Sequence, residues 1–282
     1  MGTSRVIDVP TLPLLDGNRI PAVAFGSPNA PSAIAERAFQ AAFDAGYRLI
    51  DTARSYGNED VVGRAVRASG LPREQVQVET KLAGKDHGYQ ATFDAFGVSL
   101  DALGLDYVDL YLIHWPNPQY DKYVESWKAM IELRSQGLVR SIGVSNFTDE
   151  FIQRLIDETG VAPVVNQVER HPLFPNAAQV NADQRRGIVT ESWSSLGRGH
   201  AFIHDPVLAG VARAHDVTPG QVVLRWHVQG GSVPVSYSTK PERIQQNIDL
   251  FSFELSDQEL AAIARLESGR IWGQDPAQSN YL

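Results

Sequence analysis

The feature that most constrains the fold of this chain is a regular alternation of short apolar runs with longer amphipathic segments, which continues from about residue 22 almost to the end. Eight runs have the length and composition of buried strands: 22–25, 48–51, 76–80, 108–113, 141–144, 164–166, 188–190 and 232–235. Segments between them with the pattern of helices include 32–45, 58–68, 92–103, 124–136 and 149–158. Repeated strand–helix units make parallel strands with right-handed crossovers, so eight of them predict an α/β chain closed into a (β/α)8 TIM barrel.

Both ends of the chain carry signals outside this repeat. The segment 14–20, with Asp16-Gly17 near its centre, is typical of a tight turn and predicts an N-terminal β-hairpin. After Arg265 the chain becomes polar and loop-like but keeps Trp272. Because a surface tail rarely needs a tryptophan, we expect this C-terminal loop to lie over the active site. No linker or change of composition divides the chain, so residues 1–282 are predicted to form a single domain.

The charge balance excludes several classes of partner. With 33 acidic and 25 basic residues, the net charge of −8 disfavours nucleic acid, whose phosphates require a basic surface. No apolar run approaches the about 18 residues that suggest a membrane span, and the start at 1–5 lacks the apolar core of a secretory signal. The chain has no cysteine, which excludes thiolate catalysis, and we expect no metal site. We expect a cytoplasmic, monomeric protein that acts on a small molecule and borrows a cofactor for any redox chemistry.

Three consecutive predicted strands end in ionisable residues, namely Asp51, Lys81 and His114. Function sits at the carboxyl ends of the strands in such barrels, and neighbouring strands lie ~4.8 Å apart, so these side chains can converge. Tyr56 follows Asp51 by five residues, at the start of a predicted helix, within reach of the same place. Any one of these residues alone would more often be a satisfied polar group at the rim of the barrel. Four together indicate a catalytic group.

These four residue types suit the reduction of a carbonyl group. A free tyrosine titrates near pH ~10, which is too high for an efficient acid at neutrality, and a lysine cation beside Tyr56 would lower that pKa. Asp51 would keep Lys81 charged and in position. His114 could then donate a hydrogen bond to the substrate oxygen. The residues also leave open a barrel aldolase in which Lys81 is a Schiff-base nucleophile.

Beyond these four residues, ordered motifs run through most of the chain. They are GYRLIDTA at 46–53, YGNE at 56–59, TKL at 80–82, LDYVDLYLIHWP at 105–116, SIGVSNF at 141–147 and NQVE at 166–169. With these motifs the chain resembles the aldo-keto reductase superfamily, in particular its bacterial branch related to 2,5-diketo-D-gluconate reductases and prostaglandin F synthase-like enzymes. The resemblance implies that Asp51, Tyr56, Lys81 and His114 form the catalytic tetrad, with Tyr56 as the proton donor.

The same resemblance implies an extended NADP(H) across the mouth of the barrel, without a Rossmann motif. It assigns Ser145, Asn146 and Gln167 to the nicotinamide carboxamide and Trp193 to the face of the nicotinamide ring. The loop that begins with Leu196 and Gly197 is expected to approach the pyrophosphate.

At the adenosine end, this chain departs from the pattern of the family. The residues that the resemblance places there are Ser236, Tyr237, Ser238, Thr239, Lys240, Arg243, Gln246 and Asn247. Tyr237 stands where a lysine is usual, and Gln246 stands where a glutamate is usual. A missing lysine removes a cation that commonly meets the 2′-phosphate, while Lys240 and Arg243 remain near a helix N-terminus. We therefore expect NADPH, with NADH as the alternative.

For the substrate, the resemblance points to a small aldehyde or ketone, with an imine as a further candidate. The substrate-binding residues it implies are His114, Trp115, Ser27 and Trp272. Ala24 and Arg170 also differ from the usual pattern, and we expect them to alter the pocket. A non-catalytic, cofactor-sensing subunit on the same fold is the remaining alternative, because such a protein could keep all four tetrad residues.

Overall fold

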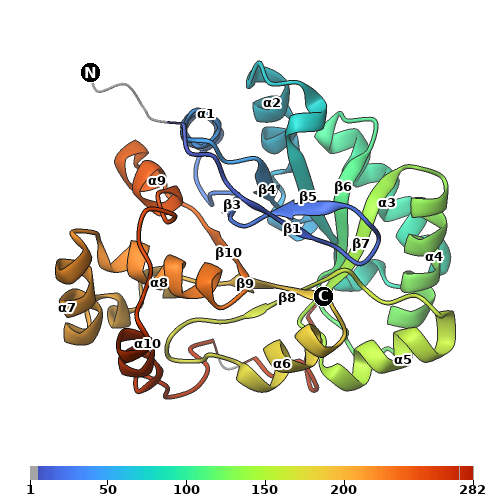
Figure 1. Cartoon of the computed structure of the whole chain (residues 1–282). Helices are drawn as coiled ribbons and strands as arrows, with labels where there is room; N and C mark the ends of the chain where they lie inside the picture. The colour runs from blue at the N-terminus through green and yellow to red at the C-terminus, as the bar shows by residue number, and fades with distance from the viewer. Residues whose placement is uncertain (1–5, 273, 282) are drawn as a thin grey trace.

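The computed structural model describes residues 6–272 and 274–281. The two ends of the predicted domain, 1–5 and 282, therefore lie outside the described residues. Eight parallel strands close into a barrel in the order β10-β3-β4-β5-β6-β7-β8-β9 (Figure 1). The strands are β3 (Ala24–Gly26), β4 (Leu49–Asp51), β5 (Gln77–Leu82), β6 (Val108–Ile113), β7 (Val139–Ser145), β8 (Val165–Glu169), β9 (Val189–Trp193) and β10 (Val233–Ser236). The predicted (β/α)8 barrel is confirmed.

Helices surround the barrel and cover its outer face (Figure 1). They are α1 (Ser32–Ala45), α2 (Glu59–Ala68), α3 (Tyr89–Leu103), α4 (Tyr123–Ser135), α5 (Asp149–Thr159), α6 (Ala177–Arg185), α7 (Pro206–His215), α8 (Pro219–Gln229), α9 (Pro241–Ile248) and α10 (Asp257–Ala264). The helices α1 to α5 match the five predicted segments to within three residues at each end. Among the described residues, no helix is long and apolar enough to cross a membrane.

The barrel interior changes from apolar to charged along the strands. Leu49 and Leu112 belong to an apolar cluster inside the barrel. Because successive strand residues alternate between two faces, the position two residues after Leu49 also faces inward, and this residue is Asp51. The same step leads from Leu112 to His114, just beyond β6. The inward-facing polar residues therefore gather at the carboxyl ends of the strands.

A hairpin closes the other end of the barrel. The strands β1 (Thr11–Pro13) and β2 (Arg19–Pro21) are antiparallel, as predicted, and Gly17 adopts a φ of +88° in the turn between them. The turn is held to β7, because Ser141 Oγ donates to Asp16 Oδ2 at 2.8 Å and Asn18 Nδ2 donates to Ser141 Oγ at 3.0 Å. The hairpin thus leaves the carboxyl ends of the strands free.

The segment after α10 returns to those carboxyl ends, where the buried Glu169 at the end of β8 holds it. The Glu169 carboxylate accepts hydrogen bonds from the backbone N–H of Ile271 at 3.0 Å and of Trp272 at 3.3 Å. It also pairs with His171 at 3.1 Å and with Arg270 at 3.4 Å. Burial alone would raise the pKa of Glu169, but the hydrogen bonds from His171 and the backbone hold it below its usual value. The predicted C-terminal loop therefore lies at the mouth of the barrel.

We expect Glu169→Gln to loosen this loop, because the amide lacks the negative charge that pairs with Arg270 and strengthens the hydrogen bonds from the backbone of the loop. Trypsin should cleave after Arg270 about tenfold faster, since cleavage follows local opening. Timed digestion with mass spectrometry measures this rate. Glu158→Gln, at an exposed ion pair on α5, is the matched control. An unchanged cleavage rate in Glu169→Gln would show that Glu169 does not hold the loop.

Candidate active site

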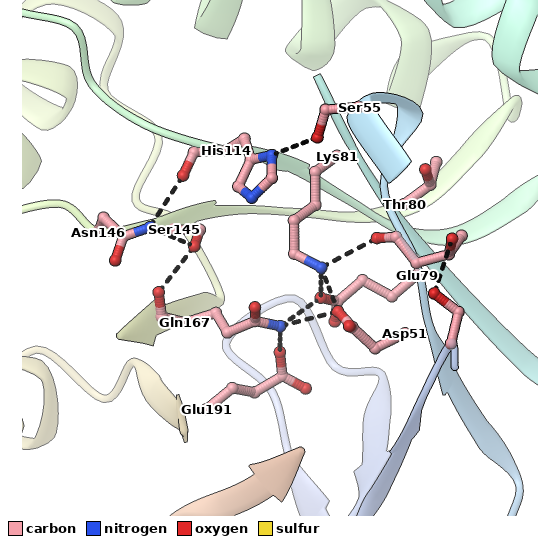
Figure 2. A network of polar contacts seen from close by, with 12 residues as sticks. Asp51, Ser55, Glu79, Thr80, Lys81, His114, Ser145, Asn146, Gln167 and Glu191 are labelled. Atoms are coloured by element: carbon pink, nitrogen blue, oxygen red, sulfur yellow. Dashed lines mark hydrogen bonds and ion pairs between the residues drawn. The ribbon is translucent and has the colours of Figure 1, made fainter. Parts of the chain in front are cut away.

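Asp51 and Lys81 form a buried ion pair on the neighbouring strands β4 and β5. The Lys81 ammonium donates to Asp51 Oδ1 and, at 2.9 Å, to the carbonyl oxygen of Thr52 (Figure 2). Burial alone would raise the pKa of Asp51 and lower that of Lys81. Their mutual attraction outweighs burial for both, so the pKa of Asp51 falls and that of Lys81 rises. The pair is therefore ionised at neutral pH.

Tyr56 lies above this ion pair. It closes a 3-10 helix, η1 (Arg54–Tyr56), and Gly57 then adopts a φ of +65°, which turns the chain into α2. The Lys81 ammonium lies 5.7 Å from the centre of the Tyr56 ring. Burial raises the pKa of Tyr56 above its ordinary value, and the positive charge of Lys81 offsets this only in part. The charge of Lys81 lowers the pKa of Tyr56, as expected. The net pKa of Tyr56 is nevertheless raised and not lowered, contrary to expectation.

His114 faces Tyr56 from the end of β6. The two rings have centres 5.8 Å apart and meet edge to face at 78°, and His114 Nδ1 lies 3.4 Å from Ser55 Oγ. Burial, together with the charge of Lys81, lowers the pKa of His114 to about 3. The imidazole is therefore neutral at physiological pH. A neutral His114 can donate a hydrogen bond but carries no spare proton, which leaves Tyr56 as the better acid.

The next three strands contribute a connected set of polar groups. Ser145 Oγ donates to the carbonyl oxygen of Gln167 at 2.8 Å, and Asn146 Nδ2 donates to Ser145 Oγ at 3.0 Å (Figure 2). Trp193 Nε1 donates to Asn146 Oδ1 at 2.8 Å. Asn146 adopts a φ of +62°, a conformation that asparagine tolerates better than most residues. The four residues predicted to hold a nicotinamide therefore lie together.

A cavity of about 230 Å³ joins these groups to the tetrad. Tyr56, His114, Ser145, Asn146, Gln167 and Trp193 line it. Trp115 and Trp272, which were predicted to bind substrate, supply apolar walls. Asp51 and Lys81 do not line the cavity but lie beneath it, where they contact residues that do. The structure thus brings together all four tetrad residues and the four predicted nicotinamide contacts.

Three residues that line this cavity had not been named as site residues, namely Arg198, Gln274 and Tyr281. The Arg198 guanidinium lies 5.4 Å from the rings of both Trp193 and Trp272. Tyr281 packs against His114 with ring centres 5.4 Å apart, and its carbonyl oxygen accepts a hydrogen bond from Asn117 at 2.7 Å. A signal for Arg198 was present in the sequence, because it lies between Gly197 and Gly199 in the loop expected near the cofactor.

The predicted adenosine-binding residues lie together on the segment from β10 to α9. Ser236 is buried and its side chain is hydrogen-bonded to Tyr47, whereas Tyr237 is exposed. Ser238 Oγ accepts from the backbone N–H of Lys240 at 3.1 Å. The other residues predicted for this end follow on α9 or just before it: Thr239, Arg243, Gln246 and Asn247. In the loop after β9, Leu196 is partly buried and Gly197 is buried with a φ of +70°.

Three expected contributors to the substrate pocket lie elsewhere. Ser27 contacts Thr52, with their hydroxyl oxygens 3.3 Å apart, and does not line the cavity. Ala24 belongs to the apolar cluster deep in the barrel. Arg170 points away from the mouth and donates to Ser232 Oγ at 2.6 Å, with its guanidinium 4.1 Å from the Trp226 ring. Neither Ala24 nor Arg170 lines this cavity.

Comparison with known proteins agrees with the fold. Residues 23–268 match the model of the aldo/keto reductase family. An aldo-keto reductase of Mycolicibacterium smegmatis is 50% identical over 96% of this chain and 98% of its own length. The 2,5-diketo-D-gluconic acid reductase B of a Corynebacterium species is 48% identical over 95% of this chain and 97% of its own length. The crystal structure of a Bombyx mori aldo-keto reductase in complex with NADP superimposes with a TM-score of 0.89 at 36% identity, covering 98% of each chain.

The chain belongs to the aldo-keto reductase family of oxidoreductases. The resemblance that the sequence motifs carried is confirmed, including its bacterial branch.

Proposed function

We propose that this protein is an NADPH-dependent reductase that converts an aldehyde or ketone to an alcohol, with Tyr56 as the proton donor. One observation carries the proposal: the Tyr56 side chain shares a cavity with Gln167 and Trp193 and lies above the ionised Asp51–Lys81 pair. A proton donor, a charge that stabilises its anion and a candidate cofactor surface thus meet at one place.

The residues present fit a nicotinamide dinucleotide. At the cavity, Ser145, Asn146 and Gln167 offer polar groups for a carboxamide, and Trp193 offers a ring face. Lys240 and Arg243 offer two cations for the phosphate end, near the start of α9. The Bombyx mori relative, whose crystal structure is a complex with NADP, supports the same cofactor here.

Bound NADPH supplies a hydride for the carbonyl carbon. The residues of the chain orient the carbonyl oxygen and supply its proton. Neutral His114 donates a hydrogen bond that orients and polarises the carbonyl oxygen. Tyr56 transfers its hydroxyl proton to that oxygen, and the Lys81 cation stabilises the phenolate that remains. Water then restores the proton to Tyr56.

The small cavity favours a short substrate. Trp115 and Trp272 provide apolar walls, and Arg198 at the mouth can attract a carboxylate. The name of the Corynebacterium relative, a diketo-gluconic acid reductase, agrees with a small acidic carbonyl compound. An imine remains a further candidate substrate. We also propose that residues 1–282 form one domain. The cytoplasmic location and the monomeric state stay predictions.

The pairing of Lys81 with Asp51 disfavours the aldolase alternative. A Schiff base requires a neutral amine, and Asp51 keeps this one charged. Turnover separates the proposal from a non-catalytic, cofactor-sensing subunit. We would titrate NADPH and NADH by protein fluorescence and then screen aldehydes, diketones and keto sugars with the tighter cofactor. We expect tighter NADPH binding and reduction of at least one carbonyl class; binding without any turnover would support the sensing subunit.

We expect Tyr237→Lys to raise the preference for NADPH over NADH by roughly tenfold, because the new cation can form a charge-assisted hydrogen bond with the 2′-phosphate. The ratio of the two dissociation constants measures the change. Tyr237→Phe is the matched control, since it adds no charge, and it should keep the wild-type ratio. Equal ratios in all three proteins would place Tyr237 away from the 2′-phosphate.

A further inference from the structure

Two buried glutamates beneath the cavity have no role in the proton transfer described above. Glu79 lies on β5 and Glu191 on β9, and both are fully buried. In the closed strand order, β5 and β9 are four strands apart and therefore face each other across the barrel. The same amide nitrogen, Gln167 Nε2, lies within hydrogen-bond distance of both carboxyl groups, which brings the two residues together. Two ionised carboxylates offer no donor, so Glu79 and Glu191 can hydrogen-bond to each other only when one of them carries a proton.

The charges around Glu79 and Glu191 also indicate that one of these two residues carries a proton. Asp51 and Lys81 already neutralise each other beside it, with Lys81 Nζ 3.4 Å from Glu79 Oε1. Two further ionised carboxylates would leave a large uncompensated negative charge in the barrel, which is strongly unfavourable. Burial, followed by the charge of Glu191, raises the pKa of Glu79 well above its usual value. Burial raises the pKa of Glu191 to about 7.

A proton would also satisfy atoms that otherwise lack a partner. As carboxylate oxygens, Glu79 Oε2 and Glu191 Oε1 are buried without a hydrogen-bond donor among the described residues. Unsatisfied buried polar atoms are uncommon and call for an explanation. A carboxyl proton supplies the missing donor.

The acids surround the amide of Gln167, which links them to the cavity (Figure 2). Gln167 Nε2 lies 2.7 Å from Glu79 Oε1, 2.9 Å from Glu191 Oε2 and 3.0 Å from Asp51 Oδ1. Ionised Asp51 can only accept a hydrogen bond, so the atom that faces it must be the amide nitrogen. Gln167 lines the cavity, and Oε1 is then the amide atom left to face it.

We propose that Glu79 and Glu191 share a proton and act as positioning residues that hold the Gln167 amide with its oxygen toward the cavity. In that orientation Oε1 accepts an N–H of the nicotinamide carboxamide. The inference rests on the proposed function for the identity of the bound group. Two acids outside the tetrad thus set the orientation of the amide that recognises the cofactor.

The test compares NADP⁺ with its 3-acetylpyridine analogue, in which a methyl group replaces the carboxamide NH₂. The analogue keeps the carbonyl group but has no N–H for Gln167. We expect the wild type to bind NADP⁺ about fivefold more tightly than the analogue, as one hydrogen bond would give. In Glu79→Met/Glu191→Met, Gln167 keeps only Asp51 as an acceptor, so this preference should fall to less than about twofold. Isothermal titration calorimetry measures both dissociation constants.

Glu79→Gln/Glu191→Gln is the matched control, because an amide pair keeps a donor and acceptors in the same places without a shared proton. It should retain the wild-type preference. The methionine variant should fold, because apolar residues of similar volume often replace buried charged groups without loss of stability. Thermal unfolding checks this, and the single variants Glu79→Met and Glu191→Met carry the same comparison if the double variant does not fold.

A full wild-type preference in the methionine variants would overturn the inference. Loss of the preference in both the methionine and the glutamine double variants would also overturn it, since a neutral hydrogen-bonded pair would then not be sufficient. The readout is binding and not turnover, so a protein that binds NADP⁺ without reducing any carbonyl still gives the ratio. Absence of turnover would contradict the proposed function alone.

Discussion

Tyr56→Phe should reduce kcat by about three to four orders of magnitude while leaving NADPH affinity within about twofold, because the variant removes a general acid and little else. The ring of Tyr56 still packs against His114 in the variant, and the Asp51–Lys81 pair stays intact. The loss should therefore appear in the hydride-transfer step. Single-turnover kinetics at 340 nm, together with a fluorescence titration of NADPH, separates the two quantities.

The matched control for this prediction is Tyr89→Phe. Tyr89 is exposed at the start of α3 and does not line the cavity, so its hydroxyl should make no difference to kcat. A Tyr56→Phe variant with more than a tenth of wild-type kcat would contradict the role of Tyr56. A parallel loss of NADPH affinity would indicate a general disturbance of the site.

Lys81→Met should destabilise the fold by about 3–5 kcal/mol at pH 7, because it leaves the buried Asp51 carboxylate without its partner. Asp51 and Lys81 are both buried, so water cannot compensate the lost charge. The rate should also fall strongly, since the phenolate of Tyr56 would lose its neighbouring cation. Urea denaturation at constant pH measures the change in the free energy of unfolding.

The double variant Asp51→Asn/Lys81→Met separates stability from catalysis. Removal of both charges should restore most of the lost stability, since no uncompensated ion remains. It should not restore the rate, because the cation is still absent. A single variant that loses less than about 1 kcal/mol would show that the pair contributes little to the fold.

The sequence was sufficient to predict the barrel and the convergence of polar residues at its mouth for one physical reason. In a parallel barrel, strand ends meet at one rim, so Asp51, Lys81 and His114 could be placed together without knowledge of the loops. Trp115 and Trp272 were also placed correctly at the cavity. The net direction of the Tyr56 pKa was not predictable, because it depends on how the surrounding groups desolvate the side chain, which only the packed structure gives.

The alternation of side chains along the strands explains two further differences between the predictions from the sequence and the structure. Arg170 follows Glu169 at the end of β8, and successive residues point to opposite sides, so Glu169 holds the C-terminal loop while Arg170 contacts α8. Its departure from the usual pattern of the family had suggested a place at the pocket. Glu79 precedes Lys81 by two residues and therefore shares its inward face. Its contact with Glu191 depends on strands on opposite walls of the barrel, which linear spacing does not reveal.

The most direct test of the central claim follows the hydride itself. The purified protein would be given NADPH labelled with deuterium at both C4 positions and an aldehyde that it reduces. The account predicts one alcohol formed for each NADPH consumed, with a single deuterium on the carbon that carried the carbonyl group. An alcohol without deuterium, or NADPH binding with no consumption by any aldehyde or ketone tested, would contradict the account.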